Sequence, residues 1–455
     1  MMEDKWKIWH CSYLFMETFC RVEYISLPLS FLLLRSYQKH IRRRLRNIPP
    51  LREEKKDLMR IQERCQPYLI PTRPSTPGNG CTLLRASWYP LSIGREERKF
   101  LYLAHHEKEY KQMVGNQLCR PLVNVRCLPE APIPEREEMK VMKQLTHIWT
   151  AGSTPSLFKR PVFIRWMKGR VKTYLKRVRQ LYYLFEHFPI MEVIYGSTLN
   201  ANGVLVTSVA QKMGAFTVNM QHGVFGEVGH LPVNADLQLV WGGSHKEFLT
   251  SYGVPEEKIE CIPPLFMQSI ASEQSSAKRK GTSKKFHLLV ALQPLGFSSN
   301  RYMIETIEEA VRDFSNRVRV SYKLHPDQTN GVKLYSGLLK NKHSRLVTHG
   351  TLPLPELMSQ ADLIITAFST VAYEGILKGK PVLFFGKKRP IYYLQRTPSF
   401  VYQVAAIRRF LRRALQNKQF LSIYRQGLVL KESPGQKNKT GMSVWDVIDR
   451  HRAQC

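Results

Sequence analysis

The clearest chemical pattern in the sequence is a pair of hydroxyl residues, Ser369 and Thr370, between an apolar run and a helical segment. Leu363 to Thr366 is suited to a buried parallel strand, and residues 371–378 to a helix closed by Gly379. Serine and threonine are favoured helix N-cap residues. A helix starting at a strand's end binds phosphate through backbone N–H groups and its dipole. The pattern therefore predicts a phosphate site, the alternative being an ordinary capped helix.

Three more side chains of the same half fit that chemistry. Glu374 lies one turn into the predicted helix, where its carboxylate would accept hydrogen bonds from ribose hydroxyls. His325 precedes Pro326, and proline disfavours helical geometry in the residue before it, so the imidazole is expected at a strand end. There His325 would donate to a phosphate oxygen, with Lys323 as a further cation. The alternative is a loop histidine that contacts solvent.

In the first half, a histidine follows a predicted strand in the sequence Gln221-His222-Gly223. Neutral histidine is the usual side chain for removing a proton from a hydroxyl near neutral pH, and glycine permits a close approach of ligand. We therefore predict His222 as a catalytic base. Glu227 and His230 are alternative bases in the same loop, and a structural role for His222 is the competing interpretation.

The elements that must position these residues alternate between strands and helices in two stretches, residues 192–262 and 286–385. Such alternation is typical of doubly wound parallel sheets. The fold class is predicted to be α/β, with two Rossmann-like domains facing across a cleft. The expected divisions are a basic, membrane-associating N-terminal region (1–95), an acceptor domain (96–268), a linker (269–285), a nucleotide-donor domain (286–400) and C-terminal helices (401–455).

The charge of the chain is unusual for its size. Its 455 residues carry 69 Lys and Arg against 36 Asp and Glu, a net charge of +33. Such an excess indicates a polyanionic partner. The basic clusters follow no nucleic-acid-binding motif, so nucleic acid has little support and an anionic membrane surface is favoured. Residues 164–188 predict an amphipathic helix with one strongly basic face, for which a solvated surface is the alternative.

Cysteine usage and hydropathy bear on location. The 8 cysteines form no CxxC pair or Cys/His cluster, which indicates a reducing cytosol. The apolar run from Tyr24 to Leu34 is interrupted by Pro28 and is shorter than a membrane span of about 20 residues. Followed by basic residues, it predicts a segment lying in the membrane interface, or alternatively a core helix. We expect a cytoplasmic protein, peripheral to the inner face of the membrane.

Four stretches carry a family resemblance between about Met191 and Gln395. They are MQHG (220–223), LVWGGSHKEFLTSYGVPEEKI (239–259), KLHP (323–326) and ADLIITAFSTVAYEGILKGKPVLFFG (361–386). With them the chain resembles the two-domain GT-B glycosyltransferases of bacterial surface polysaccharide assembly. The closest likeness is to capsule-type sugar transferases and to teichoic-acid-type glycerophosphotransferases.

The resemblance implies roles for particular residues. His325 with Ser369 and Thr370 would hold the phosphate of a nucleotide donor, Glu374 the ribose, and His222 would be the base. The sequence has no double-serine pair before the helix, which leaves a CMP-type or a UDP-type donor open. It also lacks the acidic residue with proline expected after Pro264, and the first 150 residues match nothing in the family.

The predicted function is an inverting transfer of a sugar from a nucleotide-activated donor to a capsule- or lipopolysaccharide-type glycan or glycolipid. No DxD motif stands in a suitable loop, so no metal is assigned, and no cofactor is expected besides the nucleotide-sugar co-substrate. One alternative is a transferase of polyol phosphate from a CDP-alcohol. Another is a non-catalytic GT-B-like protein that binds a nucleotide or polyanion during assembly.

Overall fold

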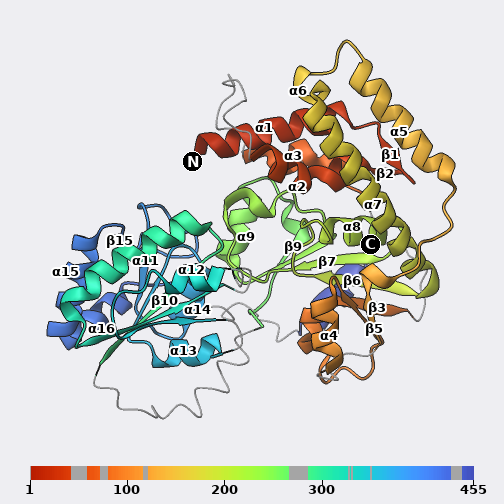
Figure 1. Ribbon diagram of the computed structural model, residues 1–455. Coiled ribbons are helices and arrows are strands. Elements are labelled where there is room, and N and C mark those ends of the chain that lie inside the picture. The colour runs from red at the N-terminus through yellow and green to blue at the C-terminus, as the bar shows by residue number, and fades with distance from the viewer. Residues whose placement is uncertain are drawn as a thin grey trace. The chain divides into compact units, whose positions relative to one another are not determined.

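The computed structural model describes residues 2–42, 59–71, 80–115, 121–265, 285–325, 328, 331–348, 351–431 and 443–454 (Figure 1). The side chains of residues 2–5, 108, 227, 228 and 418 are outside this description. The chain forms two compact units, which we describe separately. Unit 1 comprises Met1–Ile262 with Asn438–Cys455, and unit 2 comprises Pro263–Lys437. Of the predicted linker, residues 269–285, only Lys285 is among the described residues.

Unit 1 is built on a parallel sheet with the strand order β5-β4-β3-β6-β7-β8-β9. The strands are β3 (Cys81–Arg85), β4 (Phe100–Ala104), β5 (Leu122–Asn124), β6 (Ile190–Tyr195), β7 (Phe216–Met220), β8 (Leu237–Val240) and β9 (Ile259–Cys261). The sheet grows from β3 first to one side and then, from β6, to the other. The change of direction between β3 and β6 is the topological switch point, beside which doubly wound sheets bind ligands.

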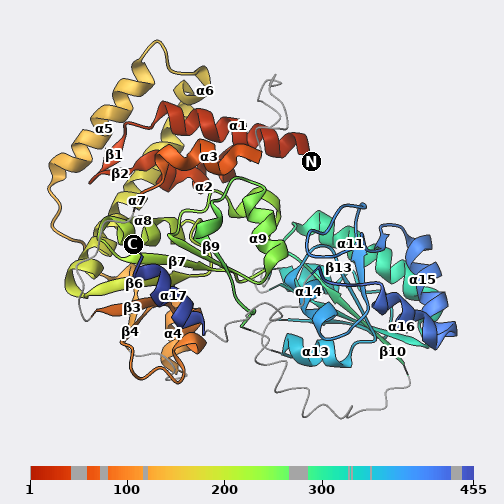
Figure 2. The same ribbon diagram turned by 180° about the vertical axis from the view of Figure 1, so that it is seen from behind.

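Helices cover this sheet on both faces (Figures 1 and 2). The helices of unit 1 are α1 (Met2–Thr18), α2 (Leu29–Arg42), α3 (Ile61–Cys65), α4 (Glu107–Gly115), α5 (Glu135–Thr150), α6 (Ser156–Lys159), α7 (Pro161–His187), α8 (Gly203–Lys212), α9 (Gly243–Thr250) and α17 (Val444–Arg452). A two-stranded antiparallel ribbon, β1 (Glu23–Tyr24) with β2 (Leu27–Pro28), precedes α2. The long helix α7 is the amphipathic helix predicted from the sequence, and its apolar side is buried.

The N-terminal segment is part of unit 1, contrary to the predicted boundary at residue 95. Strand β3 pairs with both β4 and β6, so the sheet already begins at Cys81. Helices α1 and α2 pack beside α7 through an aromatic cluster, in which the rings of Phe15 and Tyr37 stack with their centroids 4.3 Å apart. Residues 29–34, expected in a membrane interface, are buried within the protein, so the core-helix alternative is correct.

The last helix also departs from the prediction, because α17 belongs to unit 1 instead of following unit 2. Glu192 of β6 is fully buried, and its carboxylate lies 3.6 Å from Arg452 and 3.8 Å from Arg98. Trp445 donates a hydrogen bond of 3.1 Å to the Leu91 carbonyl. A buried carboxylate needs such partners, which ties the chain's end to this sheet.

Unit 2 repeats the same architecture with the parallel strand order β12-β11-β10-β13-β14-β15. Its strands are β10 (Phe286–Ala291), β11 (Val318–Lys323), β12 (Ser344–Val347), β13 (Leu363–Thr366), β14 (Val382–Phe385) and β15 (Phe400–Val401). Its helices are α11 (Phe297–Val311), α12 (Val332–Ser336), α13 (Leu354–Gln360), α14 (Thr370–Leu377), α15 (Val404–Gln416) and α16 (Lys418–Gln426). The switch point lies between β10 and β13. The predicted pair of doubly wound domains is thus confirmed.

No helix within the described parts of the chain combines the length and the apolar character required to cross a membrane.

Candidate functional site

The switch point of unit 2 is held together by the side chain of Gln293, which follows β10. Its amide group donates a hydrogen bond to the carbonyl oxygen of Phe368, after β13. Its oxygen accepts a second bond, of 2.6 Å, from the backbone N–H of Phe368. Thr366 adds a bond of 3.0 Å to the Ala291 carbonyl. The two loops at the switch point are therefore joined immediately before Ser369.

Helix α14 begins at this point, as the sequence predicted. Ser369 has extended geometry (φ −147°, ψ 152°), and its Oγ accepts a bond of 3.2 Å from the backbone N–H of Val371. Both Ser369 and Thr370 are half-buried. Further along, a Cβ at Gly375 would come within 2.9 Å of Ile364, so glycine lets α14 pack closely on β13. The positive end of the helix dipole is thus directed to the carboxyl edge of the sheet, where an anion is stabilised.

Glu374 is half-buried on the same helix. Burial raises its pKa to about 7, while the neighbouring Lys378 works in the opposite direction. Perturbed carboxyl groups of this kind are frequent in binding and catalytic sites, where a ligand's hydroxyl groups replace water. The placement is compatible with the predicted ribose contact.

Lys323 and His325 lie at the end of β11, which is the neighbour of β10 on the side away from β13. The ammonium of Lys323 donates to the carbonyl oxygens of Thr348 and Leu352 at 2.8 and 2.9 Å, and burial lowers its pKa. Two of its three donors therefore hold the segment after β12. His325 is half-buried, and Pro326 is outside the described residues. The structure brings both residues to the same sheet edge as Ser369.

Sequence reasoning missed one cation at this edge. Arg389 follows β14, and its guanidinium lies over the ring of Phe368, 4.7 Å from the centroid. The side chain is half-buried, and this burial lowers its pKa. The signal in the sequence was the basic run after a buried strand, Lys387 to Arg389. The guanidinium of Arg389 thus adds positive charge to the edge at which the N-terminus of α14 lies.

In unit 1 the predicted base lies beyond the end of β7, in a loop fixed by Gln221. The side-chain oxygen of Gln221 accepts a hydrogen bond of 2.9 Å from the backbone N–H of Trp241. Its amide group donates a hydrogen bond of 2.9 Å to the Gly223 carbonyl. His222 keeps solvent-accessible surface, although the protein around it removes enough water to lower its pKa. A hydrogen bond to the Gly196 backbone opposes this shift and Arg85 adds to it. His222 is therefore neutral near pH 7.

The two alternative bases have different surroundings. Burial lowers the pKa of His230 to about 3, and its ring centroid lies 6.3 Å from that of His222. Arg35 binds the carbonyl oxygens of Gly229 and Leu231, at 2.8 and 2.5 Å, and so holds the loop. The side chain of Glu227 is outside the described residues. Of the two histidines in this loop, His222 is exposed and His230 is half-buried.

Three further residues near His222 were not singled out from the sequence, namely Arg85, Trp88 and His105. They follow or end β3 and β4, and β3 was not recognised because Cys81 to Arg85 is short and follows a proline- and glycine-rich segment. Within the described residues, no group of three or more histidine, cysteine, aspartate or glutamate side chains is placed to hold a metal ion.

Comparison with known proteins adds a family and a fold. Residues 295–397, all in unit 2, match the model of the family described as capsule polysaccharide biosynthesis protein. The UDP-GlcNAc 2-epimerase of Neisseria meningitidis, solved with UDP-GlcNAc bound, is similar in structure, with a TM-score of 0.50 and 13% identity over 78% of this chain and 95% of that chain. A putative UDP-N-acetylglucosamine 2-epimerase from Listeria monocytogenes gives a TM-score of 0.50 and 12% identity, over 79% and 93%. None of the curated proteins matches in sequence.

We expect Ser369→Ala to cost about 1 kcal/mol of stability, because the N-cap bond to Val371 is lost. Ser369→Asp should keep the stability, since aspartate caps equally well, but should weaken the binding of UDP at least tenfold by placing a negative charge where the phosphate would lie. Urea denaturation and calorimetric titration measure the two effects. Unchanged UDP binding in Ser369→Asp would show that no phosphate lies at this terminus.

Glu374 should make the stability depend on pH. The pKa is raised from 4.5 to about 7 on folding, so the folded state retains this proton longer than the unfolded state does. Stability is then highest below pH 4.5, falls as the pH rises to about 7, and levels off above it. The fall is roughly 3 kcal/mol at most and should be absent in Glu374→Gln. Parallel curves of unfolding free energy against pH for the two proteins would contradict this.

The two doubly wound domains and the match over residues 295–397 bear out the resemblance predicted from the sequence: the chain has a GT-B-type fold, and this part of unit 2 is similar to capsule polysaccharide biosynthesis proteins.

Proposed function

We propose that the protein is a glycosyltransferase that moves a sugar from a nucleotide-activated donor to a surface glycan or glycolipid. The observation that carries the proposal is the start of α14 at the unit 2 switch point, held by the bonds between Gln293 and Phe368 and capped by Ser369. A nucleotide phosphate is the ligand that such a terminus suits. Ser369, Thr370, His325 and a remaining donor of Lys323 would bind it, and Glu374 would accept bonds from the ribose.

The transfer needs one proton acceptor and stabilisation of one leaving group. Neutral His222 removes the proton of the acceptor hydroxyl, whose oxygen forms a bond to the anomeric carbon of the donor sugar. The bond from that carbon to the phosphate oxygen breaks, and its electron pair leaves with the nucleotide. Positive groups at the unit 2 edge then stabilise the phosphate charge that develops. A single displacement of this kind inverts the anomeric configuration.

The nucleotide is proposed to be of the UDP type on the strength of the Neisseria structure, which contains UDP-GlcNAc. That likeness also makes epimerisation of a UDP-sugar a second candidate, which would need no acceptor. A polyol-phosphate transferase and a non-catalytic binding protein are the remaining alternatives. Thermal-shift measurements with UDP-, CMP-, GDP- and CDP-linked donors identify the nucleotide, because a ligand that binds only the native state raises its apparent stability.

His222→Ala should reduce the rate of transfer by about 10²- to 10⁴-fold while nucleotide binding stays intact, because the proton acceptor alone is removed. The lowered pKa of His222 places the acid limb of the wild-type kcat/KM profile below pH 6.5. Product analysis identifies the reaction: a glycoside supports the proposal, a phosphodiester indicates polyol-phosphate transfer, and turnover without an acceptor indicates epimerisation. Full activity of a folded His222→Ala protein would remove His222 from the mechanism.

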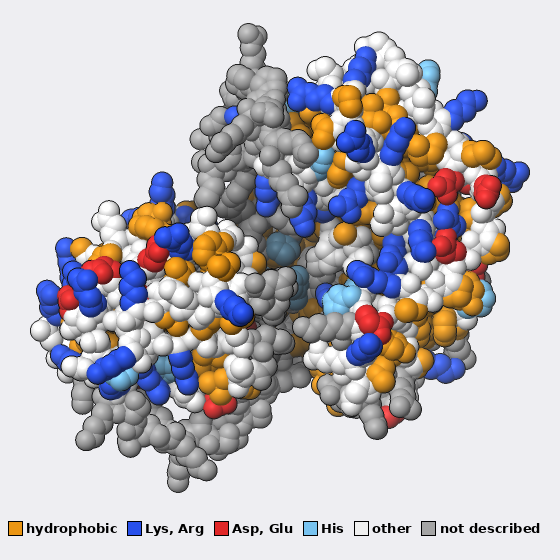
Figure 3. All heavy atoms as spheres, in the orientation of Figure 1, with side chains coloured by type: hydrophobic (Ala, Val, Ile, Leu, Met, Phe, Trp, Pro, Cys, Tyr) orange, Lys and Arg blue, Asp and Glu red, His pale blue; other side chains and the backbone are white. Residues whose placement is uncertain are grey.

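We also propose that the protein works at an anionic membrane surface, which would be the cytoplasmic face of the inner membrane. Helix α7 exposes Arg165, Lys168, Arg170 and Lys172, and none of them forms an ion pair with a described residue. Val162 on the same helix is 46% exposed, and Figure 3 shows Lys and Arg side chains among apolar ones over the region of α5 to α7. Basic and apolar groups together favour lipid headgroups.

Replacing Lys168, Arg170 and Lys172 by glutamine should weaken binding to phosphatidylglycerol vesicles more than tenfold, since each cation near such a surface contributes about 1 kcal/mol. The matched control replaces three exposed arginines of α15, Arg409, Arg412 and Arg413, and should bind as the wild type does. Co-sedimentation measures both variants, with phosphatidylcholine vesicles as the uncharged reference. An equal loss in the two variants would mean that net charge alone decides binding.

A further inference from the structure

The switch point of unit 1 has an arrangement of side chains that the proposed mechanism has not used. Arg85 is the last residue of β3, and the neighbouring pair Leu84–Ile194 places it level with Tyr195, the last residue of β6. Tyr195 in turn pairs with Asn219 of β7, three residues before His222. The ends of β3, β6 and β7 thus bring Arg85 and His222 to one edge of the sheet, at the place where its order reverses.

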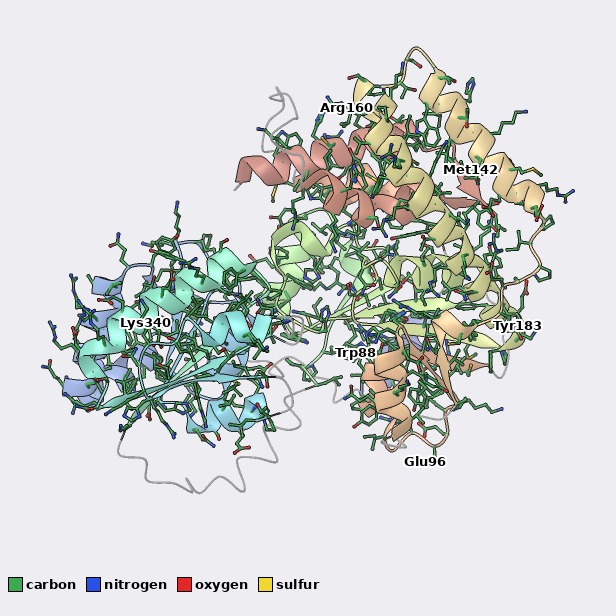
Figure 4. The ribbon with its side chains drawn as sticks, in the orientation of Figure 1. Trp88, Glu96, Met142, Arg160, Tyr183 and Lys340 are labelled. Atoms are coloured by element: carbon green, nitrogen blue, oxygen red, sulfur yellow. The ribbon has the colours of Figure 1, made fainter. Side chains whose placement is uncertain are left out.

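Gly196 connects an aromatic side chain to His222. A Cβ at Gly196 would lie 2.6 Å from Cζ2 and 2.8 Å from Nε1 of Trp88, so the indole rests against the glycine backbone and any larger residue would displace it. His222 hydrogen-bonds the backbone of the same glycine. Trp88, labelled in Figure 4, is only half-buried and so keeps part of its ring accessible. An accessible indole beside a base is a surface on which the apolar side of a sugar ring packs.

Among the described residues, the side chain of Arg85 is hydrogen-bonded through its Nε atom alone. Its Nε lies 3.3 Å from Oε1 of Glu109, whose other oxygen accepts a bond of 3.0 Å from the His105 backbone N–H. Among the described residues nothing binds the two terminal amino groups of Arg85, and its side chain is 32% exposed against 8% for Glu109. The planar fork of an arginine is suited to bidentate contact with a carboxylate or phosphate. Glu109 therefore positions the guanidinium of Arg85, and the two terminal amino groups of that guanidinium are left to bind an anion.

The neighbourhood of Arg85 contains further positive charge. His105 binds the hydroxyl of Tyr195 through Nε2 at 2.6 Å, and burial lowers the pKa of this histidine to about 3. Arg85, Arg126 and Arg177 each push the pKa of His105 in the same direction. Glu109 balances one of these three guanidinium groups, so the edge attracts anions.

We propose that this edge of unit 1 is the acceptor subsite and that it binds a sugar carrying a carboxylate or phosphate. The ring packs on Trp88, the anionic group occupies the fork of Arg85, and the reacting hydroxyl lies at His222. The assignment rests on the proposed transferase function and names the class of its acceptor. Arg85 and Trp88 are binding residues in this arrangement, because the proton passes only to His222.

The test compares three sugars with the full-length protein: D-glucose, D-glucuronate and D-glucose 6-phosphate. Saturation-transfer NMR should show that one or both acidic sugars bind at least tenfold more tightly than glucose, as expected for a charge-assisted bidentate contact. The carboxylate and phosphate arms identify which anion is preferred. Equal binding of all three, or binding of none, would overturn the subsite.

Amino-acid substitutions test whether Arg85 causes the preference for acidic sugars. The double change Arg85→Gln with Glu109→Gln removes both charges, so that no buried carboxylate is left unpaired, and should abolish the preference for acidic sugars. Arg85→Lys should keep part of it, since lysine offers a point charge without the fork. Trp88→Leu should weaken the binding of all three sugars alike. Arg21→Gln, which changes an exposed arginine of unit 1 that belongs to neither proposed binding surface, is the control and should change nothing. An undiminished preference in the double variant would overturn the assignment.

UDP titration of the same samples separates this inference from the proposed function. We expect UDP to bind the wild type and every variant equally, because all the changes lie in unit 1 while the nucleotide is assigned to unit 2. A wild type that binds UDP but has no preference for acidic sugars overturns only the acceptor subsite. A wild type that prefers acidic sugars but binds no UDP or other nucleotide overturns the transferase function instead.

Discussion

The parallel direction of the strands is the constraint on which this structure depends. Every paired strand of the two main sheets runs parallel, so all strands of a sheet deliver their carboxyl ends to a single edge. Where the strand order reverses, neighbouring loops turn to opposite faces and leave the edge accessible. In unit 2 this places the Ser369 terminus beside the loop of Gln293, and in unit 1 it places Arg85 beside Gly196. Residues far apart in sequence thus become neighbours, and in unit 2 the bonds between Gln293 and Phe368 fix their positions.

Burial then decides what the titratable groups at these edges can do. His222, His230 and His105 all have lowered pKa values, with desolvation as the largest cause in each. Only His222 of the three is exposed, and a neutral, accessible imidazole is what a general base requires. Glu374 shows the opposite shift for the same physical reason, because removing water disfavours the charged form of an acid and of a base alike.

The large positive charge of the chain serves more than one purpose. Arg98 and Arg452 compensate buried Glu192 and attach α17 to unit 1. Arg179 of α7 binds Glu130 and Glu138 at 2.6 and 3.2 Å, which joins this helix to the segment before it. Other cations, such as those at the start of α7, contact no acidic group among the described residues. The excess is therefore divided between structural ion pairs and surfaces that remain available to anionic partners.

Most of the regular structure around the site follows from local sequence signals. The apolar run 363–366, the hydroxyls at 369 and 370 and the glycine at 379 gave the strand, cap and end of α14, because these signals are local. The alternation of strands and helices likewise predicted two doubly wound domains. The candidate residues His222, His325 and Ser369 each follow a strand at the carboxyl edge of a sheet.

Other features depend on residues that are distant in the sequence, and these features emerge from the packing of the folded chain. The run 29–34 reads equally as a membrane-surface segment or a core helix, and it is the packing of α1 and α2 beside α7 that buries it. Strand β3 has five residues and no distinctive pattern of its own, and it is recognised through its pairing with β4 and β6. Contacts in the folded protein likewise identify three candidate site residues, Arg85, Trp88 and Arg389. Their neighbours are Glu109 of α4, Gly196 after β6 and Phe368 after β13, and a sequence does not display contacts that only the folded protein creates.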